Sequence, residues 1–263
     1  MEYIIFLLLG LFVGTFGTLV GIGGGLILVP FFILCMSDGG IYPYFHSAPQ
    51  IVGTSLFVVF TNACSGTLAY IRQRRVYFKA AVPFALATLP GAFLGSYVAD
   101  KFDGQMLDFY FGLFLLLMSA IMFWNTHHKP NTDIPFELDH FHYNQPLGIV
   151  SSMLVGFISS IFGIGGGIVH VPLMIYLLGF PVHIATATSH FVLACSSLMG
   201  VGSHVLLDHV VWTPAICIGI GAAAGAQLGA KLSRKTRPKL ILILLAAAVF
   251  ALGLRLILMS TAH

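Results

Sequence analysis

The sequence GTFGTLVGIGGGLILVP at residues 14–30 decides the fold, because it occurs again as GFISSIFGIGGGIVHVP at residues 156–172. Eight of the 17 aligned positions are identical, among them the whole GIGGG run and the closing Val-Pro pair. After a loop that is eight residues shorter in the second copy, the match resumes. The later matches are Thr54-Ser55 with Thr188-Ser189, Gly66 with Gly200, and Gly91-Ala92 and Leu94-Gly95 with Gly225-Ala226 and Leu228-Gly229. The chain is therefore a duplicated unit, since chance matches of small packing residues would not keep their register through Pro, Thr and Ser.

The composition puts both copies in a membrane. The chain has 263 residues, of which 58% are hydrophobic and 8% charged, and its mean hydropathy is +0.96. A soluble domain carries about 25% charged residues. The composition therefore excludes a soluble enzyme, a nucleic-acid-binding protein and a disordered chain. Long apolar stretches, in place of short alternating segments, favour helices over an outer-membrane barrel.

Eight apolar stretches fall into two groups of four. They lie near residues 3–36, 50–71, 80–99, 106–124, 147–178, 183–207, 211–230 and 240–259. We expect a first membrane repeat at 1–124, a polar, His-rich linker at 125–146 and a second membrane repeat at 147–263. Secondary transporters are often duplicated in this way, with the substrate site near the membrane midplane where the repeats meet.

The basic residues predict the topology. Nine of the 12 Lys and Arg lie at 72–79 and 231–239, and the positive-inside rule puts both segments in the cytoplasm. The first segment follows the second apolar stretch of its half, whereas the other follows the third. The two halves must then be inverted relative to each other, which requires an odd number of crossings in each half.

Four apolar stretches in each half would give an even number of crossings, so one stretch must not be a simple span. The first stretch of each half is the candidate. Residues 3–36 would be about 50 Å long as one helix, against roughly 30 Å of hydrocarbon, and they are interrupted by glycines that disfavour helix. We therefore expect an all-α polytopic membrane protein with an inverted internal repeat. Each half would be a glycine-broken re-entrant or hairpin helix pair followed by three transmembrane helices. Eight simple spans in parallel repeats are the alternative.

The glycine turns predict a binding site. Backbone outside regular helix is tolerated at membrane depth only where it lines a cavity or is buried in protein, and the N-terminus of the following helix attracts an anion. Plain packing is the competing interpretation. The Thr-Ser pairs and Asn62 would add neutral donors, although such side chains also bond to helix carbonyls. The predicted substrate-binding residues are Gly21, Gly23, Gly24, Gly25, Thr54, Ser55, Asn62, Gly163, Gly165, Gly166, Gly167, Thr188, Ser189 and His190.

Histidines occur within spans only in the second half. Ionisable groups at membrane depth indicate function, so His190 and His170 are the candidates for proton coupling. For His170 and His204, a role as satisfied interior histidines is at least as good an explanation. The linker histidines do not follow the spacing of a zinc site. We expect no metal, no cofactor and no catalytic residues.

The repeated GTxxGIGGGxxxVP-type segments, the Thr-Ser helices and the glycine pairs 91/95 and 225/229 resemble the TauE/SafE sulfite exporter family. The resemblance covers nearly the whole chain. It implies a multi-pass plasma-membrane transporter of small sulfur-containing anions such as sulfite or organosulfonates. We therefore predict a secondary active transporter of sulfite, sulfoacetate or a related organosulfonate, coupled to an ion gradient, with alternating access at the repeat interface.

A passive anion channel and an intramembrane enzyme are the alternative functions. The expected partners are a small anionic substrate and the lipid bilayer, with no nucleic acid, and a homodimer is left open.

Overall fold

The chain is all-helical wherever its structure is described. The computed structural model describes residues 2–32, 44–46, 48–99, 104–128, 141, 143–162 and 166–261, and over them it has ten helices and no strand. The helices of the first half are α1 (Glu2–Val20), α2 (Gly25–Phe31), α3 (Ala48–Arg72), α4 (Phe78–Ala99) and α5 (Gly104–His128). Those of the second half are α6 (Gln145–Phe162), α7 (Gly167–Tyr176), α8 (Val182–Leu206), α9 (Trp212–Lys235) and α10 (Pro238–Thr261).

Each of the two long apolar stretches is divided at its glycine run. The first becomes α1 and α2, and the second becomes α6 and α7. Each half then continues with three long helices, as the sequence predicted. Helix α5 continues through the first residues of the expected linker, to His128. Most of the linker, with two of its four histidines, lies outside the described residues.

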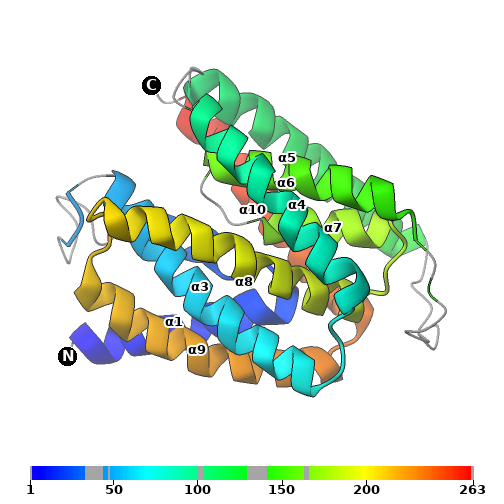
Figure 1. Ribbon diagram of the computed structural model, residues 1–263, viewed down its shortest axis with the longest axis horizontal. Coiled ribbons are helices and arrows are strands. Elements are labelled where there is room, and N and C mark those ends of the chain that lie inside the picture. Colours follow the sequence, from blue (N-terminus) through cyan, green and yellow to red (C-terminus); the bar gives the residue numbers. More distant parts are fainter. Residues whose placement is uncertain are drawn as a thin grey trace.

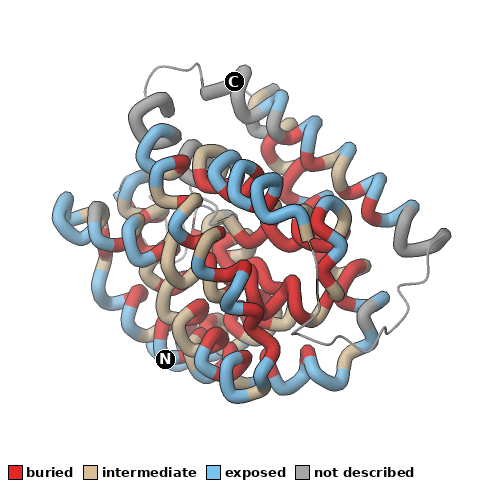
Figure 2. The backbone as a smooth tube through the Cα atoms, turned by 45° about the vertical axis from the view of Figure 1, so that its right-hand side comes forward, coloured by how far each residue is buried: buried red, intermediate tan, exposed pale blue. Residues whose placement is uncertain are grey.

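The helices suit a membrane on their outer faces as well as in their core. Among the described residues, five helices are long and apolar enough to span a bilayer, namely α1, α3, α8, α9 and α10. Buried residues fill the middle of the molecule (Figure 2). Large apolar side chains such as Phe12, Leu86 and Leu117 are well exposed, which is the arrangement expected when the outside of the protein contacts lipid.

The two halves are interwoven. Figure 1 shows two groups of helices, one with α1, α3, α8 and α9 and the other with α4, α5, α6, α7 and α10. The most extensive contacts join helices from different halves, because α1 packs on α9, α4 on α6, and α5 on α10. Each group of helices therefore draws on both copies of the repeat.

One helix–helix interface occurs twice. Between α1 and α9, a Cβ atom at Gly14 would collide with the backbone of Ala222, and a Cβ at Gly225 with that of Leu11. The repeat alignment transfers each of these pairs to the contact between α6 and α4. There, a Cβ at Gly156 would collide with the backbone of Thr88, and one at Gly91 with that of Met153. Small residues at these positions let the helix backbones approach closely.

Corresponding helices run in opposite directions where they meet. Along the α3–α8 contact, Gly53 lies against His204, Leu56 against Gly200 and Gly66 against His190, so α8 descends as α3 ascends. In the same way, Gly112 lies against Gly253 and the Ser119 hydroxyl donates to the Ala246 carbonyl, so α5 and α10 are antiparallel.

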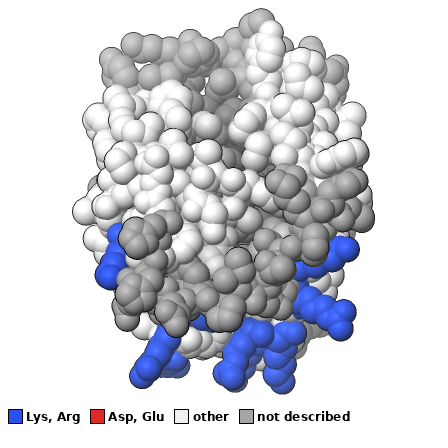
Figure 3. Space-filling model, turned by 90° about the vertical axis from the view of Figure 1, so that its right-hand side faces the viewer, with Lys and Arg blue, Asp and Glu red and all other residues white. Residues whose placement is uncertain are grey.

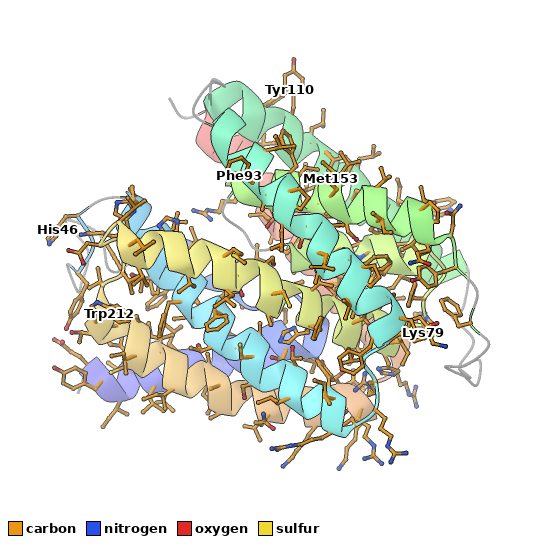
Figure 4. The ribbon with its side chains drawn as sticks, viewed as in Figure 1. His46, Lys79, Phe93, Tyr110, Met153 and Trp212 are labelled. Atoms are coloured by element: carbon orange, nitrogen blue, oxygen red, sulfur yellow. The ribbon has the colours of Figure 1, made fainter. Side chains whose placement is uncertain are left out.

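The two basic segments lie together, as the sequence predicted. The Gln73 amide donates to the Ala230 carbonyl and Arg75 donates to the Ser233 hydroxyl, joining residues 72–79 to the end of α9. Lys and Arg side chains gather at one end of the face shown in Figure 3. We call this the basic end. His46 and Trp212 lie at the opposite end from Lys79 (Figure 4), and we call that the distal end.

Candidate functional site

The first glycine turn is compact and buried. Gly21, Gly23 and Gly24 have φ angles of 90°, 79° and 84°, in the left-handed region that side chains disfavour. The N–H groups of residues 21, 22 and 23 all point to the Gly17 carbonyl oxygen, at 2.9, 2.9 and 3.2 Å. These three groups are therefore already paired within the turn. Gly25 begins α2 and is buried.

The second glycine turn reaches the first in the middle of the molecule. A Cβ atom on Gly167 would lie 2.6 Å from the Gly21 carbonyl oxygen and 2.9 Å from the Ile22 Cα. Gly166 caps the N-terminus of α7 with an ordinary φ of −60°. Gly163 and Gly165 lie outside the described residues. The two predicted turns thus meet directly.

The two hairpins approach this meeting point from opposite ends. The Tyr44 hydroxyl donates to Glu2 at 3.0 Å, and the Phe32 and Phe45 rings lie 4.8 Å apart, so α1 starts and α2 ends at the distal end. Tyr143, which precedes α6, donates to the Lys79 carbonyl and contacts Phe180, which follows α7. This second hairpin therefore starts and finishes at the basic end.

A cavity of about 750 Å³ lies beside the second turn. Its walls come from α3, α4, α6, α7 and α8, and its inner end is lined by Gly166, His170 and Ser189. Toward the distal end it is lined by Val52, His204 and Leu207, and the Leu207 side chain is 62% exposed. The cavity thus extends from the glycine turn toward the distal surface.

The inner end of this cavity has unpaired polar atoms. The His170 ring is 1% exposed, and its Nε2 lies 3.0 Å from the Ser152 hydroxyl. When that hydroxyl donates to Nε2, Nδ1 carries the proton, and Nδ1 has no partner in the described part of the chain. The same is true of the buried Ser189 hydroxyl. The positive end of α7 is close by, since Gly166 is its N-cap.

Three further hydroxyls around the cavity are already used as donors. Thr88 donates to the Ala85 carbonyl, and Ser196 and Ser197 donate to the Leu193 carbonyl. Each of these hydroxyls has only one hydrogen to donate, so they can only accept further hydrogen bonds. An anion needs donors. The rest of the wall is apolar, with Leu56, Leu89, Phe93, Val155, Val192 and Leu193 prominent.

Thr54 and Thr188 have a different environment from the cavity residues. The Thr188 hydroxyl accepts a hydrogen bond from the Tyr77 N–H at 3.1 Å. The Thr54 hydroxyl accepts one from the Val211 N–H at 3.0 Å. The repeat alignment relates these two bonds, and each joins one half to the turn between two helices of the other. Neither threonine lines the cavity.

Asn62 and His190 belong to a separate buried polar cluster. The Thr18 hydroxyl donates to Asn62 Oδ1 at 2.9 Å and lies 3.3 Å from His190 Nε2. Tyr70 donates to the Thr18 carbonyl and meets the His190 ring edge to face. Ser55 is buried on α3. None of these residues lines the cavity, so the structure divides the predicted site into two regions.

Sequence reasoning missed most of the cavity wall. Leu89 and Phe93 of α4 and Val155 of α6 carry no chemical signal, because apolar residues are found throughout the chain. His204 was noticed but had an equally good explanation as an interior residue. A prediction of which helices face each other would have been needed to find these positions.

The fold and site define an integral membrane protein whose interwoven repeats meet beside an internal cavity with a polar inner end. The profile of the family described as "Sulfite exporter TauE/SafE" matches residues 6–256, and the chain belongs to this family.

The chain is 34% identical to the probable membrane transporter protein YunE of Bacillus subtilis over 98% of each chain. It is 28% identical to a probable membrane transporter protein of Methanocaldococcus jannaschii, over 96% of this chain and 94% of that one. A third relative, from Sinorhizobium sp, is 30% identical over 96% of this chain and 91% of its own. No solved structure matches significantly. The protein is therefore a membrane transporter of the TauE/SafE type.

Proposed function

We propose that the protein is a secondary active transporter of a small sulfur-containing organic anion, such as sulfoacetate or a related organosulfonate. The cavity beside the second glycine turn is its substrate site. The observation that carries this proposal is the polar inner end, where His170, the Ser189 hydroxyl and the N-terminus of α7 border one mainly apolar space, and where His170 Nδ1 and the Ser189 hydroxyl have no partner in the described part of the chain.

These groups suit a sulfonate or sulfite head group. Both side chains can donate a hydrogen bond, and a helix N-terminus favours negative charge without a fixed cation. Binding by neutral donors keeps the anion releasable, as a carrier requires. An ammonium or guanidinium group at this depth would hold it more tightly and would itself be costly to bury.

The size and walls of the cavity favour an organic anion. A volume of about 750 Å³ is in the range of sites for organic ligands, and one sulfite ion would fill only its inner end. An alkyl or acyl portion attached to the sulfonate would lie along Leu56, Leu89 and Val192. Each buried methylene group stabilises binding by about 0.8 kcal/mol.

In the proposed transport cycle, the two inverted repeats move relative to each other and open the site to one side of the membrane at a time. The antiparallel course of α3 and α8, and of α5 and α10, supports an inverted repeat, as do the hairpins that enter from opposite ends. The basic end would face the cytoplasm of a cell with this protein in its plasma membrane. The cavity lies toward the distal end, so this conformation would be open outward.

We further assign proton coupling to His190, with His170 contacting the substrate. His190 is fully buried and Nδ1 has no partner in the described part of the chain. It follows Ser189 directly on α8, so protonation of its ring and binding in the cavity would be linked through two adjacent residues of one helix. Ionisable side chains within membrane spans commonly mark proton pathways in transporters.

Binding of a homologous series of anions tests this function. Purified protein is titrated with methane-, propane- and hexanesulfonate, and with sulfite and sulfate, while binding is measured by calorimetry and by the rise in unfolding temperature. We expect affinity to increase about fourfold for each added methylene. A His170→Leu variant, which introduces the residue found at the matching first-half position Leu28, should weaken binding of every anion.

Other outcomes would reject part of this proposal or indicate one of the alternative functions. Equal or greater affinity for sulfite would reject the organic substrate, and an absence of binding by all these anions would reject the site. In liposomes, flux that does not saturate with substrate would indicate a channel, and chemical conversion of the anion would indicate an enzyme.

A further inference from the structure

Two turns at opposite ends of the molecule have the same backbone. One joins α3 to α4 at residues 70–77, and the other joins α8 to α9 at residues 204–211. Arg74 and Asp208 both have a φ of 56°, and they are the only described non-glycine residues with positive φ. The N–H of Arg75 bonds to the Tyr70 carbonyl, and that of His209 bonds to the His204 carbonyl, at 3.1 and 2.9 Å.

The two turns are also held to the rest of the fold in the same way. The Tyr77 N–H of the first turn is bonded to Thr188, and the Val211 N–H of the second is bonded to Thr54. Because the repeat alignment relates every one of these residues, the two turns are copies of one structural motif. They differ only in the side chains that they carry.

At the basic end, the turn carries an arginine that joins three elements. Arg75 is buried, and its guanidinium lies 5.0 Å from the centre of the Tyr70 ring. It donates to Gln73 Oε1 of its own turn at 3.1 Å, and to the His183 carbonyl and the Ser233 hydroxyl at 3.2 Å each. Those partners belong to the turn itself, to the start of α8 and to the end of α9.

The guanidinium also remains charged. Burial lowers the pKa of Arg75, Tyr70 raises it and Arg234 lowers it, but an arginine stays protonated at any physiological pH. All of its hydrogen-bond partners are neutral. The charged guanidinium is therefore held by hydrogen bonds to neutral groups and not by a carboxylate. Such contacts can break and form again more easily than a buried ion pair.

The arginine covers a small buried cluster that closes the basic end. We call this the basic-end cluster, and its members come from α3, α8, α9 and the region where α4 begins. They are Ala69, Tyr70, Val76, Ala81, Ala187 and Ala230. Alanines let four segments meet closely. Tyr70 of this cluster contacts the Thr18 carbonyl and the His190 ring on one side and Arg75 on the other, so it lies between that region and the arginine.

At the distal end, no hydrogen bonds like those of Arg75 are found for the corresponding described residues. His204 and His209 replace Tyr70 and Arg75, with their rings 5.5 Å apart, and Leu207 replaces Gln73. Nδ1 of each histidine has no partner in the described part of the chain. His204 and Leu207 instead line the cavity. The same turn is thus latched at one end and unlatched at the other.

We propose that the Arg75 turn is a latch that holds the basic end closed, and that the His209 turn is the matching, weaker latch of the distal end. Opening toward the basic side breaks the Arg75 contacts with His183 and Ser233. Closure of the distal end forms the equivalent contacts of His209. This inference rests on the alternating-access cycle proposed above, and it assigns to Arg75 a positioning role away from the substrate.

Cysteine accessibility tests the latch without any substrate. In a background with Cys35, Cys64, Cys195 and Cys217 replaced by Ala, two single reporters are labelled by a membrane-impermeant maleimide from either side. Ser196→Cys reports on the cavity, and Ala187→Cys reports on the basic-end cluster. We expect the first to react from the distal side and the second to react slowly from both.

Removing the arginine should open the basic end. With Arg75→Gln, Ala187→Cys should be labelled several-fold faster from the basic side, and Arg75→Lys should be intermediate because it keeps the charge but lacks the planar fork. Arg72→Gln is the matched control, since Arg72 is exposed on the same segment and loses the same charge. Equal labelling rates in Arg75→Gln and Arg72→Gln would overturn the proposal.

Transferring the latch should have the opposite effect at the distal end. The triple change His204→Tyr, Leu207→Gln and His209→Arg leaves Arg75 intact, so it decides the question even where Arg75→Gln does not fold. We expect slower labelling of Ser196→Cys and faster labelling of Ala187→Cys. Unchanged rates at both reporters would reject the latch, whereas failure of sulfonate binding alone would reject only the substrate proposed above.

Discussion

Two adjacent residues, Thr188 and Ser189, show what the sequence could and could not predict. The duplicated Thr-Ser pair predicted that both residues would contact the substrate. The structure gives the two hydroxyls different partners, because successive helix residues point about 100° apart. Thr188 accepts a bond from the Tyr77 N–H, while Ser189 lines the cavity. The repeat indicated the position, but the facing helices determine each role.

This difference predicts opposite effects of two small changes. Ser189→Ala removes an unpaired buried hydroxyl, so anion affinity should fall while thermal stability is unchanged or higher. Thr188→Val leaves the Tyr77 N–H without its acceptor, which should destabilise the protein by about 1–3 kcal/mol with little change in affinity. Calorimetric titration and thermal unfolding of both variants make the comparison. Loss of affinity in Thr188→Val alone would exchange the two roles.

The two glycine turns also separate a structural from a functional effect. Gly24 has a φ of 84°, and an added Cβ would lie 2.5 Å from Val13 Cγ1. Gly24→Ala should therefore lower stability by about 1–3 kcal/mol. Gly166 has an ordinary φ and borders the cavity. Gly166→Ala should fold normally and abolish transport, as measured by liposome flux beside a melting curve. Full transport by Gly166→Ala would remove this turn from the site.

His190 can be separated from the cavity by its pH response. Replacement by Gln keeps a side chain able to bond with Thr18 but unable to titrate. If His190 carries the coupled proton, His190→Gln should flatten the pH dependence of transport, because glutamine does not titrate. Anion binding at fixed pH should change little. An unchanged pH profile would assign His190 to packing within the Thr18–Asn62 cluster.

At the scale of helices, sequence patterns predicted the elements well and their partners poorly. Apolar length and the GIGGG runs were enough to predict the break between α1 and α2 and between α6 and α7. No pattern indicated that α1 would pack on α9 of the other half, because Gly14 and Gly225 could serve any close helix contact. Pairing depends on the whole set of surfaces that must be buried together.

The duplicated interface predicts matched responses to matched changes. Gly225→Ala and Gly91→Ala occupy corresponding positions, and in each the new Cβ meets backbone of the facing helix. Each should lower the free energy of unfolding by at least about 1–3 kcal/mol. Gly202→Ala on α8 is the control, because nothing lies within 4 Å of its Cβ position. Equal melting temperatures for Gly202→Ala and Gly225→Ala would contradict the close contact.

At the scale of the molecule, charge predicted the arrangement of the ends. The positions of nine cations in the sequence were sufficient to expect residues 72–79 and 231–239 at one end, as the bonds of Gln73 and Arg75 confirm. The same reasoning treated Arg75 only as a marker of topology. Its burial over Tyr70 depends on α8 and α9 converging there, which the sequence alone does not reveal.

The inverted repeat makes a definite prediction about sidedness. Single cysteines at Arg72 and Lys235 should react with an impermeant reagent from one side of sealed vesicles, and cysteines at His46 and Leu207 should react only from the other. The first pair belongs to the basic end, where excess Lys and Arg favour the cytoplasm. The second pair belongs to the ends of elements that start or finish distally. If Arg72 and Lys235 reacted from opposite sides, the halves would be parallel, and the correspondence between the Arg75 and His209 turns would lose its mechanical meaning.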